Sequence, residues 1–191
     1  MGSEPDINGK AHFNEWSTTY EQSITQWLLF DRVHQGVLNR IPGNFTPGGV
    51  LDIGCGTGRL LRRFGKRWPA TNLIGLDIAD GMLRQARLRT PAASFYLASA
   101  EQIPFPDASI DLVTSTTSFH HWSDQAQGIC QAARVLRPGG LFILADMSLS
   151  MHGHPLSAHQ VRSMFEAAGL VVRKQNSPVL FYTFTVGEKM R

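Results

Sequence analysis

The stretch VLDIGCGTG at residues 50–58 constrains the fold of this chain more than any other part of its sequence. Residues 50–53 are apolar apart from one acid and indicate a buried strand. The glycines at 54, 56 and 58 then form a loop, because glycine readily adopts positive φ angles and lets a ligand approach the main chain. A helix is predicted from 59 to 67. These features together predict a strand, a ligand-binding loop and a helix, the first unit of an α/β fold.

The alternation of strands and helices continues along the chain. Further strands are predicted at residues 72–77, 94–98, 110–115 and 141–147, and helices at 80–89, 124–136 and 157–168. Asp80 is expected to cap the first of these helices, Ser123 or Asp124 the second, and Gly169 to follow the third. Residues 137–140, Arg-Pro-Gly-Gly, are predicted to turn the chain before the fifth strand.

The connections between the strands decide how the sheet is built. Helix-length segments between successive strands imply right-handed crossovers, and so a mostly parallel sheet with helices on both faces. Two closing strands are predicted at residues 171–175 and 179–186, with a turn at 176–178. This connection is too short for a parallel crossover, so the last strand pair is expected to be antiparallel. The predicted fold class is therefore an α/β three-layer sandwich, with ligands beyond the carboxyl ends of its strands.

The length of 191 residues suits a single domain. Apolar residues recur at helical spacing over 21–41, so residues 1–44 are expected to form a helical cap on an α/β core at 45–191. No stretch reaches the roughly 20 apolar residues of a membrane span, and the first residues lack the features of a secretory signal. We therefore expect a cytoplasmic protein with no membrane partner, as a monomer or homodimer.

Charge and cysteine usage exclude several function classes. The formal net charge is +3, and the basic residues gather at 59–67 and 84–89. This pattern indicates the solvated outer faces of two helices, so a nucleic-acid partner is not expected. Cys55 and Cys130 are far apart and lack metal-ligand spacing, and no carboxylate stands among the histidines at 152, 154 and 159. Neither a disulfide framework nor a metal site is expected.

The spacing of the glycines narrows the kind of ligand. A dinucleotide fingerprint requires Gly-x-Gly-x-x-Gly, with its third glycine at the position that Arg59 occupies here. A phosphate-binding P-loop is also excluded, since no Gly-Lys-Ser/Thr follows. Asp77 ends the second predicted strand about 20 residues after the loop, where an acid accepts the hydroxyls of a ribose. The loop and Asp77 together indicate a nucleoside ligand that is not a dinucleotide.

Five motifs in order carry a resemblance to a known family: VLDIGCGTG, IGLDIADGMLRQAR, ASAEQIPFPDASIDLV, SFHHWSD and RVLRPGGLFILAD. Over residues 48–147 they resemble class I S-adenosylmethionine-dependent methyltransferases, of the ubiquinone- and menaquinone-biosynthesis-like (type 11) group. FNEWSTTYEQ is similar to the opening motif of that group. The resemblance implies a seven-stranded Rossmann-like sheet, S-adenosylmethionine as cofactor and S-adenosylhomocysteine as product. The implied activity is methyl transfer to a small-molecule acceptor.

The same resemblance implies which residues bind the cofactor. Asp52 would steer the ammonium group of the methionine part, Asp77 would hold the ribose, and Ile78 and Met82 would sandwich the adenine. Ser99 stands where the family places an acid against the adenine amino group, and this departure loses the charge assistance of that hydrogen bond. The other implied cofactor residues are Gly54, Cys55, Gly56, Gly58, Ala100, Thr116 and, as a lid over the cofactor, Tyr20.

The acceptor side is less defined by the sequence. His120 and His121 follow the fourth predicted strand, and imidazole titrates near neutral pH, so they are the candidate catalytic bases. Trp16, Phe119 and Trp122 are candidate walls of the acceptor pocket. The short segment at 148–156 indicates an open pocket roofed by residues 10–44. Oxygen, nitrogen, carbon and sulfur acceptors all stay open.

Two other functions also stay open at this point. The basic helices suggest a nucleic-acid methyltransferase, although Thr116, Thr117, Ser118 and Phe119 replace the Asn/Asp-Pro-Pro-aromatic loop of enzymes that methylate base amino groups. Ser99 and the compact acceptor side suggest a non-catalytic module that binds S-adenosylmethionine. Assays of binding and of turnover separate these alternatives.

Overall fold

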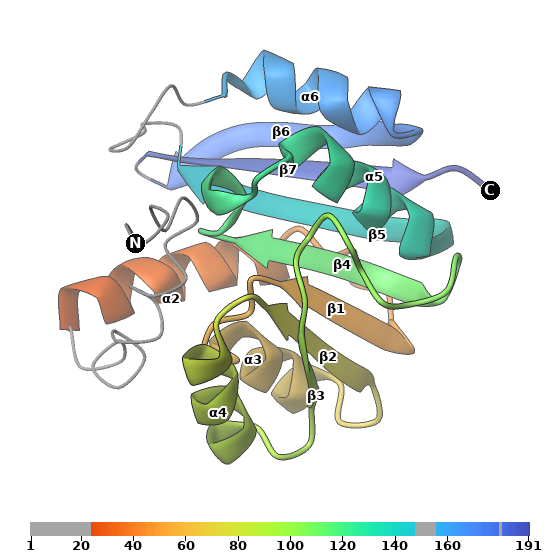
Figure 1. Ribbon diagram of the computed structural model, residues 1–191. Helices are drawn as coiled ribbons and strands as arrows, with labels where there is room; N and C mark the ends of the chain where they lie inside the picture. Colours follow the sequence, from red (N-terminus) through yellow and green to blue (C-terminus); the bar gives the residue numbers. More distant parts are fainter. Residues whose placement is uncertain (1–23, 148–155, 180) are drawn as a thin grey trace, which may run out of the picture.

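The computed structural model describes residues 24–147, 156–179 and 181–191, with side chains from Leu28 onward (Figure 1). A seven-stranded sheet forms the middle layer, in the order β3-β2-β1-β4-β5-β7-β6. Its strands are β1 (Gly49–Ile53), β2 (Asn72–Asp77), β3 (Ser94–Leu97), β4 (Ile110–Thr116), β5 (Leu136–Met147), β6 (Leu170–Val179) and β7 (Tyr182–Lys189). The first five run parallel, whereas β7 is antiparallel to both of its neighbours. The predicted fold class is confirmed, including the antiparallel last pair.

Helices cover both faces of the sheet and complete the three layers. The helices are α2 (Ile24–Leu38), α3 (Arg59–Arg67), α4 (Asp80–Arg89), α5 (Gln125–Val135) and α6 (Ala158–Ala167). One apolar cluster joins α5 and α6 to one sheet face through Ile129, Ala132 and Phe165. A second cluster joins the other three helices to the opposite face through Val33, Val37, Leu60, Leu61, Phe64 and Leu83. Alternate strand residues supply both clusters, because side chains of a strand point to opposite faces in turn.

The predicted helix at 59–67 matches α3, and the helix predicted to follow Asp80 and run to about residue 89 corresponds to α4. Asp124 caps α5 by accepting a hydrogen bond from the Gln127 N–H, and Ser157 forms a capping box at α6. Gly169 follows α6 with a φ of +80°, as predicted for a left-handed residue at a helix end. The cap predicted at Asp80 is wrong, because Asp80 is the first residue of α4 and Ala79 is its N-cap.

Two turns differ from their predicted places. Residues 137–140 belong to β5, which pairs with β4 from Leu136 onward and shifts its register before Leu141. The closing hairpin reverses after Val179, not at residues 176–178, because β6 continues through Pro178. Proline lacks the N–H that a central strand needs, but β6 is an edge strand, where this is tolerated.

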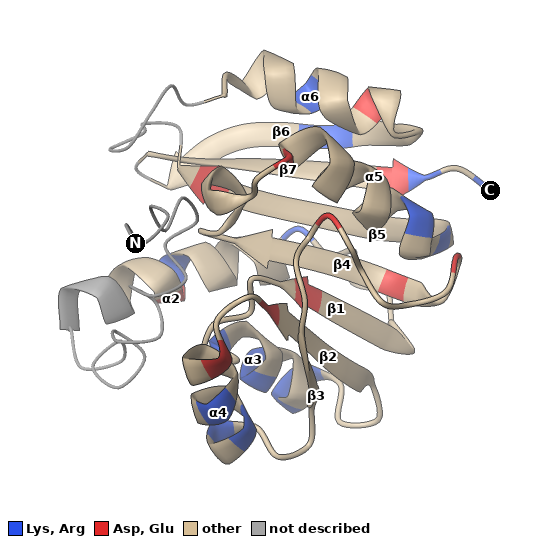
Figure 2. Cartoon of the chain, in the orientation of Figure 1, with Lys and Arg blue, Asp and Glu red and all other residues tan. Residues whose placement is uncertain are grey.

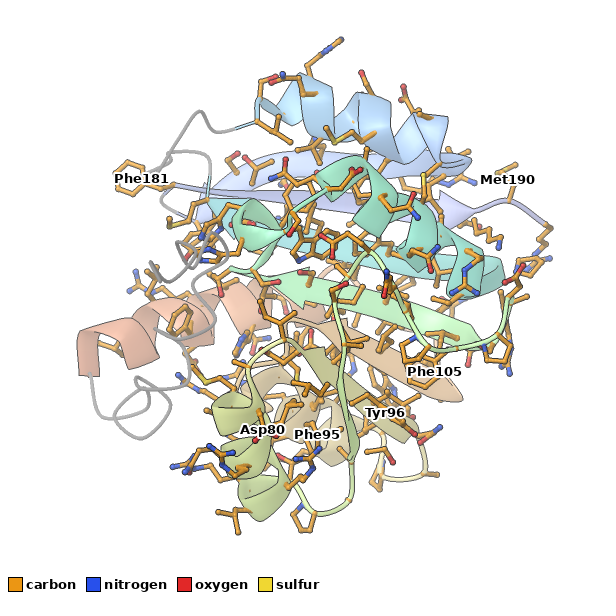
Figure 3. The ribbon with its side chains drawn as sticks, viewed as in Figure 1. Asp80, Phe95, Tyr96, Phe105, Phe181 and Met190 are labelled. Atoms are coloured by element: carbon orange, nitrogen blue, oxygen red, sulfur yellow. The ribbon has the colours of Figure 1, made fainter. Side chains whose placement is uncertain are left out.

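Lys and Arg residues are concentrated on α3 and α4 (Figure 2). Several of them pair with acids: Arg63 with Asp31, Arg84 with Asp80, and Arg134 with Asp107. Such pairing agrees with the solvated-face interpretation of the basic residues. At the outer edge beside β3, the rings of Tyr96 and Phe105 stack edge to face with centroids 5.0 Å apart (Figure 3). Within the described part of the chain, no helix has the length and apolar character to cross a membrane.

Candidate functional site

The glycine loop between β1 and α3 has the backbone conformation that its composition predicts. Gly54, Gly56 and Gly58 have φ angles of 68°, 52° and 76°. The N–H groups of Gly54 and Cys55 both donate to the carbonyl of Leu76, at 2.7 and 3.0 Å, which folds the loop over the end of β2. A Cβ added at Gly54 would lie 2.1 Å from Oγ of Ser118. The loop therefore needs glycine at 54, where Ser118 from the segment after β4 packs against it.

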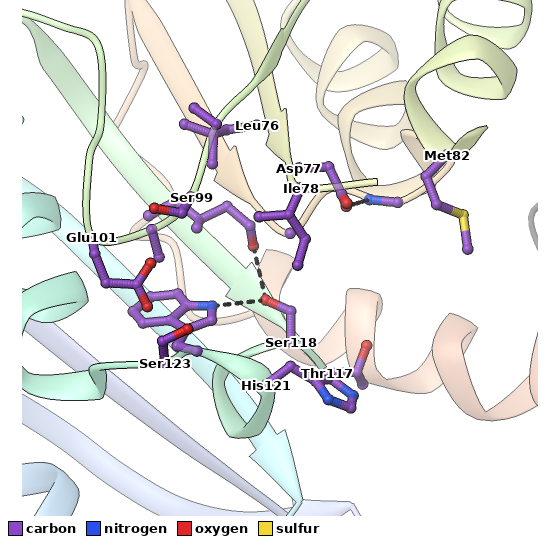
Figure 4. Close-up of a pocket in the computed structure, with 16 residues that line it drawn as sticks. Leu76, Asp77, Ile78, Met82, Ser99, Glu101, Thr117, Ser118, His121 and Ser123 are labelled. Carbon is purple, nitrogen blue, oxygen red and sulfur yellow. Dashed lines mark hydrogen bonds between the residues drawn. The ribbon is translucent and has the colours of Figure 1, made fainter. Parts of the chain in front are cut away.

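The main cleft of the site lies beside this loop, with an empty volume of about 730 Å³ (Figure 4). The carboxyl ends of β1, β2, β3 and β4 and the segments that follow them supply its lining. Among the predicted cofactor residues, those that line it are Gly54, Gly56, Asp77, Ile78, Met82, Ser99 and Ala100. Four loops that are distant in sequence converge here, as expected for the switch point of an open α/β sheet.

A second cavity, of about 340 Å³, lies on the other side of the glycine loop. It shares Gly54, Gly56 and Thr117 with the main cleft. Its other lining residues from the predicted set are Asp52, Cys55 and Thr116. Ten of the twelve predicted cofactor residues line one or both of the two cavities. Seven of these ten line the main cleft.

The last two predicted cofactor residues have other positions. A Cβ added at Gly58 would lie 3.1 Å from Oγ1 of Thr90 and 3.3 Å from the ring of Phe95, so this glycine allows packing of the loop against its neighbours. Gly58 lines neither cavity. Tyr20 lies outside the described residues, as do Trp16, His152, His154 and the part of the predicted roof at residues 10–23.

Asp77 ties the glycine loop to the start of α4. Its Oδ2 accepts a hydrogen bond from the Gly56 N–H at 2.8 Å, and its Oδ1 accepts one from the Ala79 N–H at 2.9 Å. Burial raises the pKa of this carboxyl, and the hydrogen bonds from Ala79 and Gly56 oppose that shift. Asp77 thus fixes the segment just before α4, whereas the carboxylate of Asp80 forms an ion pair with Arg84. An ionised carboxylate has about four acceptor positions, so Asp77 has capacity left for a ligand in the cleft.

Asp52 is the buried acid of the second cavity. It is 2% exposed, and its Oδ1 accepts a hydrogen bond from Oγ1 of Thr114 at 2.7 Å. Burial raises the pKa of Asp52 to about 7; the Thr114 hydrogen bond opposes this shift and the nearby Asp77 charge adds to it. Burial also raises the pKa of the Cys55 thiol, with Asp77 and Asp52 adding to the effect. Cys55 therefore carries a thiol and not a nucleophilic thiolate at neutral pH.

The two candidate bases differ in their surroundings. The Nδ1 atom of His120 lies 2.7 Å from Oδ1 of Asp146, and the His120 N–H donates to Oδ2 of the same carboxylate at 2.9 Å. His121 lines the main cleft, and its ring lies 4.0 Å from that of His120, centroid to centroid. The His120 side chain is 34% exposed and Asp146 only 10%. The structure therefore distinguishes a histidine paired with an acid from one that faces the cleft.

Several residues of the site were not singled out from the sequence. Ser118 accepts a hydrogen bond from Nε1 of Trp122 at 3.2 Å and donates to the Ile53 carbonyl at 3.3 Å, which fixes the wall opposite the glycine loop (Figure 4). Glu101 lines the cleft and accepts a hydrogen bond from the Asp124 N–H. Asp146 could have been predicted from the sequence, because an acid that follows the apolar run of β5 lies at the carboxyl edge of the sheet. His34 of α2 lines the second cavity, and no local pattern pointed to it.

The site can now be compared with those of known proteins. Residues 51–144, from β1 into β5, match the family described as methyltransferase domain. This segment carries most of the lining of both cavities. Residues 51–144 therefore belong to the class I S-adenosylmethionine-dependent methyltransferases, as the order of motifs in the sequence predicts.

The relatives of the whole chain agree with this class. A probable S-adenosylmethionine-dependent methyltransferase of Mycolicibacterium smegmatis is 31% identical over 187 residues, covering 90% of this chain and 65% of the relative. The 27-O-demethylrifamycin SV methyltransferase of Amycolatopsis mediterranei is 34% identical over 170 residues, covering 85% and 60%. The chain thus spans less than two thirds of the length of either relative. A crystal structure of a SAM-dependent methyltransferase from Aquifex aeolicus has the same fold, with a TM-score of 0.75 and 20% identity over 92% of this chain and 97% of that one.

Proposed function

We propose that this chain binds S-adenosylmethionine across the two cavities and transfers its methyl group to a small-molecule acceptor. The observation that carries the proposal is the meeting of the two cavities at Gly54 and Gly56, with one acid in the lining of each cavity. Asp77 faces the main cleft and Asp52 the second cavity. This arrangement suits a ligand with a ribose on one side of the loop and an ammonium group on the other.

The residues present fit this cofactor. Glycine at 54 leaves room for the Ser118 side chain, whereas a Cβ at Gly56 would have no neighbour within 4 Å, so a ligand can lie against the main chain at Gly56. Ile78 and Met82 supply apolar surface for an adenine in the main cleft, where Ser99 supplies a hydroxyl and Ala100 a main-chain N–H. Asp77 would accept the ribose hydroxyls with its remaining lone pairs. In the second cavity, Asp52 would accept the ammonium group.

S-adenosylmethionine supplies a methyl group that its sulfonium already activates. The protein must therefore align an acceptor with that group and exclude water, and positioning of this kind contributes about 7 to 11 kcal/mol in favourable intramolecular cases. Trp122, held by Ser118, would form the apolar wall against the acceptor. Phe119 is buried in the core and supports Trp122 by stacking on it edge to face at 5.1 Å.

We assign the base to His120 in preference to His121. Asp146 accepts from Nδ1 of His120 and so leaves Nε2 of the exposed ring as the proton acceptor. Hydroxyl and carbon acceptors must lose a proton to react, so the pair suits these better than neutral amines or thiolates. The name of the Amycolatopsis relative, a methyltransferase of a demethylated oxygen, agrees with a hydroxyl acceptor.

The organisation of the whole protein stays a prediction. We expect one domain, with residues 1–44 as a cap on the core at 45–191, in a cytoplasmic monomer or homodimer. Sedimentation analysis and limited proteolysis test the oligomeric state and the domain boundary.

The decisive experiment measures binding and turnover separately. Calorimetry with S-adenosylmethionine and S-adenosylhomocysteine is followed by an assay for S-adenosylhomocysteine with phenols, alcohols, quinols, thiols and amines as acceptors. We expect binding of both ligands and turnover with at least one hydroxyl or carbon acceptor. Gly54→Ala should abolish binding, because its Cβ meets Ser118. Gly43→Ala is the matched control, because a Cβ there has no neighbour within 4 Å.

Each alternative predicts a different outcome. Binding without turnover on any acceptor would support a non-catalytic binding module and contradict methyl transfer. Absence of heat with S-adenosylmethionine at millimolar concentration would refute the cofactor itself. Methylation of RNA or DNA in place of the small acceptors, with steeply salt-dependent binding, would support the nucleic-acid alternative.

A further inference from the structure

The closing hairpin between β6 and β7 carries an aromatic residue at a position that favours glycine. Val179 pairs with Tyr182, so Phe181 belongs to the tight reversal between the two strands. Its φ is +62°, in the left-handed region, and the residue is 52% exposed. Tight hairpin reversals normally use glycine, asparagine or aspartate, because a bulky residue rarely adopts a positive φ. Neither the turn geometry nor burial in the core accounts for a phenylalanine here.

The contacts on either side of Phe181 fix this backbone conformation. Tyr182 is 3% exposed and packs in the second apolar cluster, and it pairs with Met147 at the carboxyl end of β5. Across the hairpin, the hydroxyl oxygens of Ser177 and Thr183 lie 2.9 Å apart. A strained residue persists where its surroundings determine its position, and such residues cluster at ligand sites. The hairpin therefore fixes the main chain from which the Phe181 ring projects.

The strand order places Phe181 on the same edge of the sheet as the candidate base. From β1 the sheet continues through β4 and β5 to β7, with the glycine loop after β1, His120 after β4 and Asp146 in β5. Asp146 pairs with Thr183 of β7, and Phe181 lies two residues further, which corresponds to roughly 7 Å along a strand. Figure 3 shows the Phe181 side chain beyond the ends of β6 and β7. An acceptor that meets the methyl group beside His120 can therefore extend over β5 to this ring.

The residues along this edge define the chemistry of that part of the acceptor. Asp146 is charged, and its carboxylate is already bonded to His120. No lysine or arginine occurs at residues 145–147 or 181–183. An anionic group would meet the Asp146 charge here without a basic residue to offset it, which is unfavourable. An aromatic ring, in contrast, can stack on Phe181 edge to face or offset. The edge therefore suits an uncharged aromatic body.

We propose that Phe181 forms the far wall of the acceptor site and determines specificity for hydroxyl compounds with an uncharged aromatic body. The inference rests on the proposed function and names the class of its acceptor. The reacting hydroxyl lies at His120, and the remote end of the ring system contacts Phe181. Trp122 borders the near side, in the main cleft. Phe181 thus adds to the binding of the acceptor and has no part in the binding of the cofactor.

The test measures acceptor binding to the product-bound protein, so it does not depend on turnover. Calorimetry follows the binding of phenol and of 2-naphthol to the complex with S-adenosylhomocysteine. Both probes carry an aromatic hydroxyl, and 2-naphthol adds a second ring that extends toward Phe181. Phe181→Gly should weaken binding of 2-naphthol by about tenfold, as expected for loss of much of one apolar side-chain contact, and binding of phenol by less. The affinity for S-adenosylhomocysteine should stay unchanged.

The variants include controls for backbone strain and for loss of an exposed ring. Glycine readily adopts a positive φ, so Phe181→Gly should not lower the melting temperature. Phe181→Tyr keeps the ring and should retain the affinity for 2-naphthol. Ala108→Gly changes another residue with a positive φ, and Tyr96→Ala removes an exposed ring from the opposite half of the sheet. Both should leave the affinities for the two probes unchanged.

The outcomes separate this inference from the proposed function. No binding of 2-naphthol to the wild-type complex, or equal affinity for it in Phe181→Gly, would overturn the role of Phe181 and leave the proposed function intact. A lower melting temperature with weaker binding of S-adenosylhomocysteine in Phe181→Gly would assign this residue to packing of the chain and also overturn its role. Failure of the wild-type protein to bind S-adenosylhomocysteine would overturn both.

Discussion

The Nδ1 atom of His120 lies 2.7 Å from Oδ1 of Asp146, and the main-chain N–H of His120 donates to the second oxygen of that carboxylate. Both contacts come from residues at the carboxyl ends of neighbouring strands, His120 after β4 and Asp146 in β5. Two hydrogen bonds to one carboxylate fix both the ring and its main chain. Asp146 is therefore a positioning residue for His120.

If His120 is the base, His120→Asn should lower kcat by about 10² to 10⁴ with a hydroxyl acceptor, which is the usual range for general-base catalysis. The dissociation constant for S-adenosylhomocysteine should stay unchanged, and added imidazole should restore part of the rate. Asp146→Asn should lower kcat less. His159→Asn on α6 is the control. An unchanged kcat in the His120 variant would assign proton removal elsewhere.

Asp77→Ala should act on both the ligand and the fold. Loss of charge-assisted hydrogen bonds costs about 1.5 to 3 kcal/mol, so affinity for S-adenosylmethionine should fall by one to two orders of magnitude. The Gly56 and Ala79 N–H groups would also lose their acceptor, so the melting temperature should fall. Asp80→Ala, which removes the exposed acid that pairs with Arg84, is the control for both measurements. An unchanged dissociation constant would show that Asp77 serves the loop alone.

Cofactor affinity should depend on pH through Asp52. Burial raises the pKa of this acid to about 7, so its carboxyl is largely protonated at pH 6 and ionised at pH 8. An ammonium group binds the ionised carboxylate in preference to the protonated acid, so affinity for the cofactor should rise roughly tenfold from pH 6 to pH 8. Below pH 7, binding should release the proton of the Asp52 carboxyl. Calorimetry in buffers of different ionisation enthalpy measures that proton. Asp52→Asn should flatten the profile, and an equally steep profile in this variant would exclude Asp52 as its source.

The raised pKa of Asp52 also affects the stability of the ligand-free protein. Because the folded-state pKa of Asp52 lies above its ordinary value of 3.8, the folded state binds more protons than the unfolded state between those limits. The contribution of Asp52 to stability therefore falls as pH rises from about 4 to 7. Denaturant titrations of the wild-type and Asp52→Asn proteins across this window should show the difference, with the larger decrease in the wild type.

Ser99→Asp should tighten binding of the cofactor. A carboxylate would accept a hydrogen bond from the adenine amino group with charge assistance, which is roughly twice as strong as the bond to a hydroxyl. The variant should also gain discrimination against the inosine analogue of S-adenosylhomocysteine, which lacks the amino group, whereas the wild-type protein should discriminate less. Ser94→Asp, at the start of β3, is the control. Unchanged selectivity between the two nucleosides would place the adenine away from Ser99.

The sequence was sufficient wherever the determining interactions are local. Apolar periodicity and helix-end residues predicted the bounds of α3, and those of α4 except for its cap. The three glycines predicted the positive φ angles of the loop. The order of strand and helix signals predicted a mostly parallel sheet, because helix-length crossovers permit few other arrangements.

Only the tertiary structure decided which distant side chains meet. Asp146 reaches His120 because β5 lies next to β4, and His34 reaches the glycine loop because α2 packs on the sheet face that carries α3. The closing turn moved beyond Pro178 because β6 is an edge strand. Asp77 reaches the Gly56 N–H because the loop after β1 lies against the end of β2. Such contacts depend on strand order and helix packing, which are set by burial of the whole core and not by the neighbours of a residue along the chain.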